Sequence, residues 1–279
     1  MKREDYNRIL RLYPKQKWLV KKESELFSLL QHCDLPHQKE LVFELLNEFI
    51  YVDLELLEIY LENIAEYIVN SSGFTLERTI ITALAWEGDP DSSQMIIQLL
   101  RPWMTRKGWN NVAFASNVPK GMKLLNKYGY DQVILVDEFL GTGRTAEIRI
   151  EYLRQGAVRD LEIKACFVAG MKFGLCKISK LYDDVFCTLE LDQAITDKYS
   201  GIEKTNAIRS MHQLETKLLN DINGKKLKDY KFGFSKTQAL YSSYGNIPNS
   251  VFPIFWWPYD NESKNRNVLF IRNETGLEL

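Results

Sequence analysis

Hydrophobic residues recur every three to four positions through the first 72 residues of the chain. The runs from Leu41 to Ile50 and from Leu57 to Ile68 show this spacing most clearly, and it places their apolar side chains on one face of a helix. Pro36 suits a first helical position, and Ser71-Ser72-Gly73 is typical of a helix end. The pattern predicts an N-terminal block of amphipathic helices over residues 1–72, with apolar faces that pack on the same chain or on a partner protein.

From residue 73 onward the pattern changes to short apolar runs that alternate with helical stretches. Continuous apolar runs of this length are typical of strands buried on both faces of a parallel sheet. Strands that alternate with helices form such a sheet, with helices on both sides. We therefore expect an α/β core over residues 73–200, a mostly parallel sheet with flanking helices. The five predicted strands are Thr79–Trp86, Val112–Ser116, Val133–Val136, Leu161–Ala169 and Asp184–Leu191.

The last segment, residues 201–279, combines a predicted helix over Glu203–Asn220 with a stretch rich in proline and aromatic residues, Phe232–Pro258. The prolines exclude a regular helix in that stretch. Such a segment is ordered when it packs on the body of the protein. It could form a lid or hood over the strand ends, where aromatic rings would stack on a nucleobase, or it could fill a core, which is the more common use of aromatic residues.

The most informative stretch is VILVDEFLGTGRT, residues 133–145. Its apolar run leads into Asp137 and Glu138 and then into a turn rich in glycine and threonine, at the carboxyl end of a strand, where open α/β sheets bind ligands. Glycines, threonine hydroxyls and the N-terminus of the following helix suit a phosphate. The two carboxylates suit sugar hydroxyls or Mg²⁺. The alternative is an ordinary turn whose residues cap the helix.

This stretch resembles the signature of the type I phosphoribosyltransferases, with no position out of register from Asp137 to Thr145. The resemblance implies that Asp137 and Glu138 bind the ribose hydroxyls of phosphoribosyl pyrophosphate (PRPP) at the catalytic site. It also implies a 5′-phosphate site formed by Gly141, Thr142, Gly143, Arg144 and Thr145. The chain has no G-x-x-x-x-G-K motif, and its Gly-Thr-Gly lacks the third glycine of a dinucleotide fingerprint.

A second polar loop, from Glu87 to Ser93, follows the first predicted strand. In the family that the chain resembles, the loop at this place holds the pyrophosphate group. The resemblance therefore assigns that role to Gly88, Ser92 and Ser93. The loop also carries three carboxylates that would repel a pyrophosphate unless a divalent cation lay between them. The sequence therefore predicts a Mg²⁺ site, or else an unusual ligand. The alternative is that the loop only caps the next helix. The predicted metal ligands are Glu87, Asp89 and Asp91.

The tail reads Asn246-Ile247-Pro248-Asn249 and continues to Pro253 and Phe255-Trp256-Trp257. Together with the helical block and the acidic loop, this tail is similar to that of phosphoribosyltransferase-related effectors of bacterial conflict systems. The resemblance implies a role in antiviral defence, with partner proteins that bind the N-terminal helices.

Composition narrows the possible partners. The formal net charge is only −1, so no overall basic field indicates direct binding of nucleic acid. No stretch of eighteen apolar residues predicts a membrane span, and the N-terminus is too charged for a signal peptide. The four cysteines form no C-x-x-C pair and are expected to be free thiols. We expect an intracellular, cytoplasmic protein.

Two functions remain open at this point. The chain could be an enzyme that binds PRPP or a nucleotide and makes or breaks the bond at the ribose C1′, a reaction that needs no strong nucleophile. It could instead be a sensor that binds the same ligand without turnover and signals to a partner through the helical block. A purely structural α/β scaffold is a third possibility.

Overall fold

The computed structural model describes residues 3–86 and 91–272. By its internal contacts the chain divides into two compact units. Leu54–Leu191 is called the sheet unit here, and Met1–Asp53 with Asp192–Leu279 is called the terminal unit. This division differs from the three segments expected from the sequence, because the helix that begins at Leu54 contacts the strands of the sheet unit.

The sheet unit contains a five-stranded, entirely parallel sheet with the strand order β3-β2-β4-β5-β6. All five strands lie where the apolar runs predicted them, and the α/β architecture is confirmed. β4 is the central strand, and its residues Val133 and Leu135 pair with Ile80 and Thr82 of β2. The strands are β2 (Thr79–Ala83), β3 (Ala113–Ala115), β4 (Gln132–Leu140), β5 (Glu162–Met171) and β6 (Asp184–Leu191).

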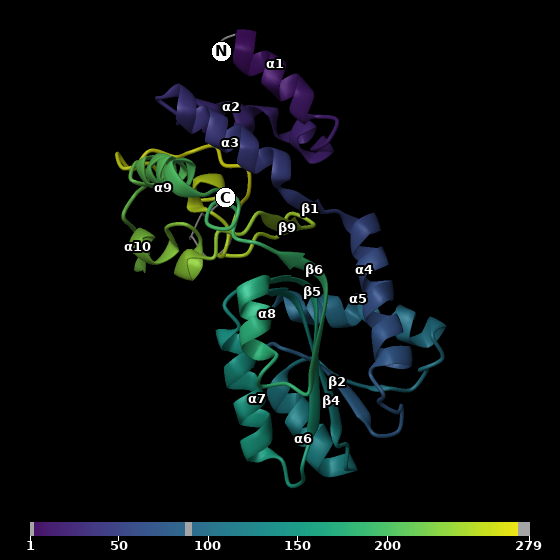
Figure 1. The fold of residues 1–279 in the computed structure, drawn as a ribbon. Coiled ribbons are helices and arrows are strands. Elements are labelled where there is room, and N and C mark those ends of the chain that lie inside the picture. Colours follow the sequence, from purple (N-terminus) through teal and green to yellow (C-terminus); the bar gives the residue numbers. More distant parts are fainter. Residues whose placement is uncertain (1–2, 87–90, 273–279) are drawn as a thin grey trace. The chain divides into compact units, whose positions relative to one another are not determined.

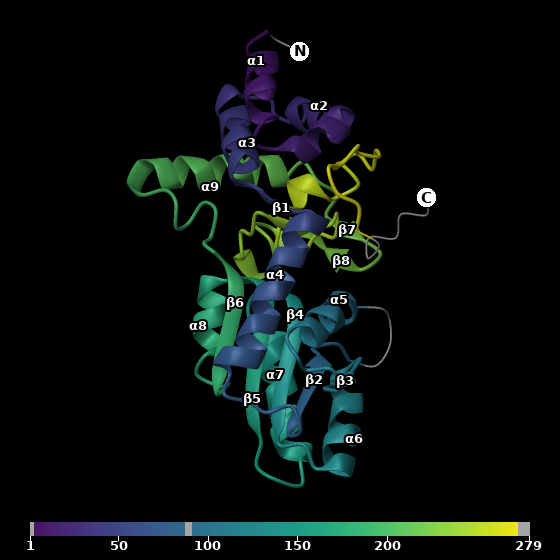
Figure 2. The same ribbon diagram turned by 90° about the vertical axis from the view of Figure 1, so that its right-hand side faces the viewer.

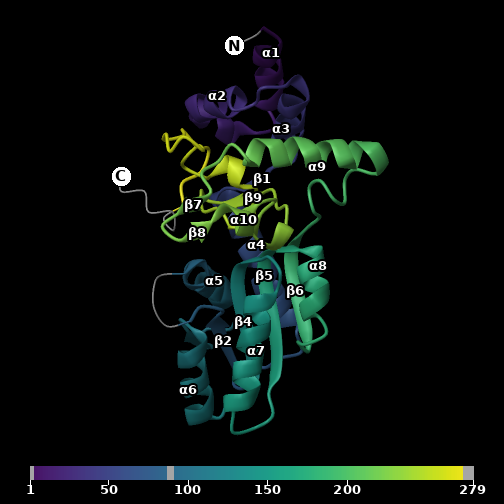
Figure 3. The same cartoon turned by 90° about the vertical axis from the view of Figure 1, so that its left-hand side faces the viewer.

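Helices cover both faces of this sheet, as Figure 1 shows with the strands nearly edge-on. One layer contains α6, α7 and α8, and the other contains α4 and α5 (Figures 2 and 3). Alternate residues of β4 point to opposite layers, so Val133 and Leu135 join the core under α6, α7 and α8. The helices are α4 (Leu54–Glu66), continued by a π-helical turn (Tyr67–Ser71), α5 (Ser92–Arg106), α6 (Val118–Tyr128), α7 (Arg144–Gly156) and α8 (Lys172–Ile178).

The terminal unit combines the first 53 residues with the last part of the chain. Among the described residues, the only strand pairing between those two segments is the short parallel pair of β1 and β9, in which Ile50 lies opposite Tyr241. Its helices are α1 (Arg3–Leu12), α2 (Glu23–Gln31), α3 (Pro36–Glu48), α9 (Gly201–Glu215) and α10 (Leu227–Tyr230), with 3-10 turns at Lys17–Lys22, Phe234–Lys236 and Pro253–Phe255. Its strands are β1 (Ile50–Val52), β7 (Asp221–Ile222), β8 (Lys225–Lys226) and β9 (Tyr241–Ser243).

The aromatic residues of the tail fill the core of the terminal unit. Trp256 and Trp257 are buried, and each indole N–H donates a hydrogen bond of 3.0 Å to a main-chain oxygen, on Val251 and Leu219 respectively. Phe252 and Phe255 are fully buried beside them. These four rings therefore fill a core, and their buried faces are not available to stack on a nucleobase.

None of the helices in the described ranges has both the length and the hydropathy required to cross a membrane.

Candidate phosphoribosyl site

The two signature acids lie inside β4. We expected the strand to end at Val136, but it continues to Leu140, because Phe139 and Leu140 go on pairing with Ala169 and Gly170 of β5. Asp137 pairs with Phe167 of β5. The acids are thus held by the backbone of the central strand at its carboxyl end, where the sheet presents a ligand site.

Burial makes Asp137 and Glu138 unlike ordinary surface carboxylates. The side chain of Glu138 is almost fully buried. The side chain of Asp137 has many protein atoms around it but is still partly exposed to solvent. Burial raises the pKa of Asp137 well above its usual range, and the charges of Asp91 and Glu138 raise it further. The main-chain N–H of Glu138 donates to Asp137 Oδ1 at 2.7 Å and opposes this shift. Asp137 therefore lies where a cation or a hydroxyl donor would be favourable.

After β4 the chain turns through Gly141, Thr142 and Gly143 into α7. Gly143 has a φ of +77° and occupies the N-cap position, a left-handed conformation that costs other residues energy. The N–H of Arg144 makes a long 3.4 Å contact with the Thr142 hydroxyl. Arg144 and Thr145 are exposed in the first turn of the helix, where main-chain N–H groups point outward and attract anions. The predicted phosphate residues are thus together at one helix N-terminus.

The turn is held in place by α8, which sequence reasoning missed. A Cβ atom added to Gly174 would lie 2.1 Å from the main-chain oxygen of Gly141, and one added to Gly143 would lie 2.7 Å from Ile178 Cγ2. Only glycine at position 174 allows this backbone contact. In the sequence, Gly174 is visible only as a glycine shortly after the predicted strand Leu161–Ala169. Nothing in its spacing indicates that it packs against the turn.

The second loop is described only from Asp91 onward, so Glu87, Gly88 and Asp89 lie outside the described residues. Asp91 caps α5 by accepting hydrogen bonds from the N–H and the hydroxyl of Ser93, at 2.8 and 2.6 Å. Ser93 is buried, and its hydroxyl accepts a hydrogen bond from the N–H of Ala85 after β2. Asp91 and Ser93 therefore cap α5, as the alternative interpretation of this loop expected. A pyrophosphate role for Ser92 and Ser93 stays a prediction.

The predicted Mg²⁺ site also stays a prediction. Within residues 3–86 and 91–272, no group of three or more Asp, Glu, His or Cys side chains is arranged to hold a metal ion. Asp91 is nevertheless close enough to Asp137 to raise its pKa. Carboxylate oxygens are the ligands that a hard divalent cation prefers.

Arg149 connects α7 with the residues just after β2 and was not predicted. It is one turn beyond Thr145 on α7, and its Nε donates a hydrogen bond of 3.2 Å to the main-chain oxygen of Leu84. Its guanidinium carbon lies 4.5 Å from the centre of the Trp86 ring. The pKa of Arg149 is lowered by burial, and the charge of Asp91 opposes that shift. A cation therefore stands beside the acids of the site.

A cavity of about 560 Å³ adjoins the second loop. Asp91 lines one end of it, and the rest of its wall comes from α5, the end of β3 and the start of α6. Arg101 stacks on Phe114, with 4.8 Å between the guanidinium carbon and the ring centre, and Lys120 also lines this cavity. This cavity and the candidate site share Asp91.

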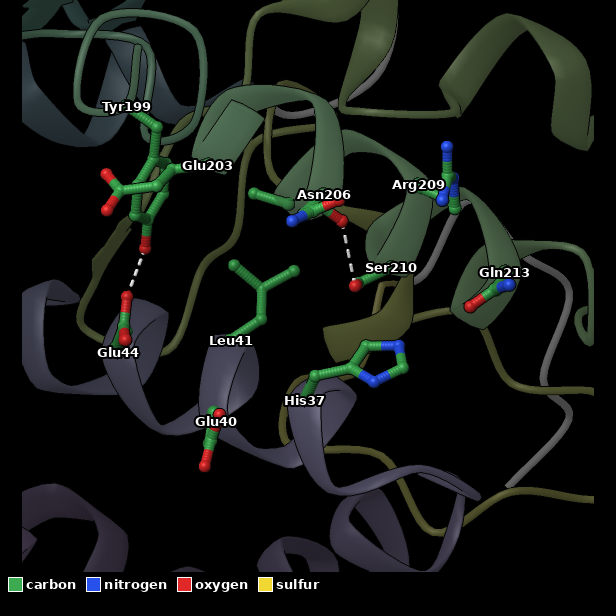
Figure 4. Close-up of a pocket in the computed structure, with 11 residues that line it drawn as sticks. His37, Glu40, Leu41, Glu44, Tyr199, Glu203, Asn206, Arg209, Ser210 and Gln213 are labelled. Atoms are coloured by element: carbon green, nitrogen blue, oxygen red, sulfur yellow. Dashed lines mark hydrogen bonds between the residues drawn. The ribbon is translucent and has the colours of Figure 1, made fainter. Parts of the chain in front are cut away.

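The terminal unit has its own cavity of about 670 Å³ between α3 and α9 (Figure 4). Its wall carries three carboxylates, on Glu40, Glu44 and Glu203, and the Tyr199 hydroxyl donates a hydrogen bond to Glu44. Burial and this carboxylate raise the pKa of Tyr199. Of the residues predicted to bind phosphate, ribose or metal, none that the structure describes lines this cavity.

Several solved structures are similar to parts of this chain. A hypothetical protein from Neisseria gonorrhoeae with bound ppGpp is 12% identical over 52% of this chain and 85% of its own, with a TM-score of 0.36. A xanthine-guanine-hypoxanthine phosphoribosyltransferase from Helicobacter pylori is 11% identical over 53% and 92%, with a TM-score of 0.33. An adenine phosphoribosyltransferase from Thermoanaerobacter pseudethanolicus is 16% identical over 49% and 81%, with a TM-score of 0.33.

The comparison with curated proteins found no match. The comparison with protein families did, because the model of the PRTase-CE family matches residues 31–272. This match includes the whole sheet unit and most of the terminal unit. The chain therefore belongs to the PRTase-CE family of phosphoribosyltransferase-like proteins.

Proposed function

We propose that the sheet unit binds a 5-phosphoribosyl compound, either PRPP or a nucleoside 5′-phosphate, and acts at the ribose C1′. The supporting observation is the glycine-held turn at the N-terminus of α7, which follows the partly exposed Asp137 and the buried Glu138 at the carboxyl end of the central strand. An anion site about one loop away from hydrogen-bond acceptors matches a sugar phosphate.

Each group has a simple task in this proposal. The N–H groups and hydroxyls from Thr142 to Thr145 bind the 5′-phosphate. Asp137 and Glu138 accept hydrogen bonds from the ribose hydroxyls. Bond exchange at C1′ passes through an oxocarbenium-like state, so holding the ribose in place and excluding water supply much of the catalysis. A bound Mg²⁺, held by Asp137, Asp91 and the ligand's own phosphates, would neutralise charge on the departing group.

Isothermal titration calorimetry with ribose 5-phosphate, PRPP and nucleoside monophosphates, with and without Mg²⁺, tests the proposal. We expect all of these ligands to bind, and T145V and D137N to weaken binding by about tenfold or more. The exposed Thr105, on α5 of the same unit, offers the matched control T105V. If ribose 5-phosphate does not bind, or if T145V and T105V behave alike, the proposal is wrong.

The second candidate function is a sensor without turnover. The specific observation in its favour is the cavity between α3 and α9, whose wall carries Arg209 and three carboxylates, two of them in ion pairs with Arg8 and Lys198; such a charged wall suits a polar segment of a partner protein. Incubation with PRPP or nucleotides, followed by assays for pyrophosphate and free base, separates the two functions. Product formation supports the enzyme, and tight binding without product supports the sensor.

The resemblance of the tail and the helical block to conflict-system effectors supports a biological setting for either function. In that setting the chain acts in bacterial antiviral defence. Survival of phage infection by cells that carry the wild-type chain or D137N tests this part. Equal survival with both would contradict it.

A further inference from the structure

We propose that Arg149 binds the diphosphate group of PRPP, a role that rests on the proposed function and assigns its diphosphate subsite to a residue outside the signature. The juxtaposition behind it is the position of Arg149 between the start of α7 and the end of β2. It is one helical turn beyond Thr145, and its Nε donates a hydrogen bond to the main-chain oxygen of Leu84, the residue after β2. One side chain thus connects the helix that follows the proposed 5′-phosphate turn with the end of β2.

The guanidinium of Arg149 is held in a defined orientation. Its carbon lies 4.5 Å from the centre of the Trp86 ring, and Tyr152 packs edge-on against that ring with 4.8 Å between the ring centres. Stacking on an aromatic face fixes the plane of a guanidinium and strengthens with loss of water. Fixing this plane in advance lowers the entropy lost when the group forms hydrogen bonds with a ligand.

The hydrogen-bond donors of Arg149 are mostly unused. A guanidinium has five N–H donors, and within the described residues only Nε donates a hydrogen bond, with no carboxylate paired to the group. Trp86 remains 40% exposed, so the place where Arg149 is stacked is reachable from solvent. The free N–H groups form the fork that binds phosphate oxygens in pairs.

Charge gives the reason for a cation here. Arg149 interacts electrostatically with Asp91, and Asp91 and Glu138 interact in turn with Asp137, so a diphosphate bound beside these acids would be repelled. Because Arg149 interacts electrostatically with Asp91, it lies close enough to balance these acids. The signature supplies main-chain donors to the 5′-phosphate only, so a second anion needs a separate partner.

Comparison of two ligands tests the proposal. PRPP and ribose 5-phosphate share the ribose and the 5′-phosphate and differ by the diphosphate. Calorimetry in the presence of Mg²⁺ should show that R149Q weakens PRPP binding by about 10- to 100-fold and changes ribose 5-phosphate binding less than about twofold. R149K keeps the charge and loses the fork, so its PRPP affinity should fall between those of R149Q and the wild type.

Arg154, on the same helix with a side chain about half exposed (49%), gives the control R154Q, which should bind both ligands as the wild type does. Thermal unfolding of each variant checks that the fold is kept. Equal weakening of both ligands in R149Q would show that Arg149 only anchors Leu84, and unchanged PRPP binding would show that it does not reach the ligand. Either result overturns the proposal while the proposed function stands. Failure of the wild type to bind either ligand overturns both.

Discussion

Gly174 lets α8 approach the turn that we propose to bind phosphate, because it lacks a side chain. A methyl group at this position would come within 2.1 Å of the Gly141 oxygen, a distance that no packing adjustment of a flexible group can relieve. We expect G174A to displace the turn and to weaken ribose 5-phosphate binding by about tenfold or more, because small displacements of binding groups have large effects. Calorimetry measures the effect.

Gly156, at the end of α7, provides the control. A methyl group there would meet the end of the flexible Met122 side chain at 2.8 Å, which can move aside, so G156A should bind ribose 5-phosphate as the wild type does. Similar affinities of G174A and G156A would contradict the role of Gly174 in holding the turn.

Glu215 makes the stability of the terminal unit depend on pH. Its carboxylate is fully buried and accepts hydrogen bonds from the N–H of Phe232 at 2.9 and 3.1 Å. Burial raises its pKa from the usual 4.5 to about 8. Between these values the folded state holds a proton that the unfolded state has released, so the free energy of unfolding falls as pH rises through this window.

We expect E215Q to remove this slope. Urea unfolding of the wild type and E215Q at several values from about pH 5 to pH 9 measures it, and the difference between the two proteins cancels the contribution of every other titrating group. The difference should change by a few kcal/mol, about 1.4 kcal/mol for each unit of pKa shift at most. A difference that stays constant across this range would show that Glu215 titrates normally.

The residues of the signature could be predicted from the sequence because they are contiguous, so chain order alone brings them together. The contacts of Gly174 and Arg149 could not be predicted in this way. Gly174 meets the turn only after α8 folds back on α7, and Arg149 reaches Leu84 only because β2 and β4 are neighbours in the sheet. Contacts of this kind depend on the tertiary structure.

At the scale of elements, the five strands were predictable because each is a continuous apolar run in a parallel sheet. The residues at which the strands end were less predictable. β4 extends beyond its apolar run because main-chain pairing with β5 continues past Asp137, and β2 ends at Ala83 although apolar residues continue to Trp86. Hydrogen bonds to a neighbouring strand, which periodicity does not report, decide where a strand ends.

The tail segment from Val251 to Trp257 is expected to stabilise the terminal unit. Trp257 is fully buried and donates a hydrogen bond to Leu219. W257F removes that bond and part of the packed volume, which should cost about 1–3 kcal/mol of unfolding free energy. Urea unfolding followed by circular dichroism measures the loss. The partly exposed Trp103 of α5 gives the control W103F, which should cost clearly less. Equal costs would contradict a core role for the segment.

At the scale of the whole molecule, the sheet unit contains its own core and every described residue of the proposed phosphoribosyl site. We expect residues 54–191 expressed alone to fold, as judged by a cooperative thermal transition, and to bind ribose 5-phosphate within about threefold of the full chain's affinity. A fragment with a cooperative transition but no binding would show that the terminal unit completes the site. A fragment without a transition would show that the two units fold as one.

The sequence could not predict this nested organisation. The helical pattern of residues 1–72 is continuous, and nothing in its periodicity separates α4, which joins the sheet unit, from α3, which joins the terminal unit. Amphipathic faces of similar width can pack on either body. The choice depends on which apolar surface the rest of the chain offers.

The pairing of β1 with β9 has a consequence for the order in which the protein is made. Ile50 leaves the ribosome long before Tyr241, its partner, and all of residues 54–191 are translated between them. Because domains generally fold as units while synthesis proceeds, the inserted sheet can be complete while Phe49 of the opening segment still lacks its partners Phe255 and Phe270. A translation arrest just after Leu191 has emerged from the ribosome would leave a nascent chain with a complete sheet unit and an apolar, uncovered beginning, a state suited to recognition by chaperones.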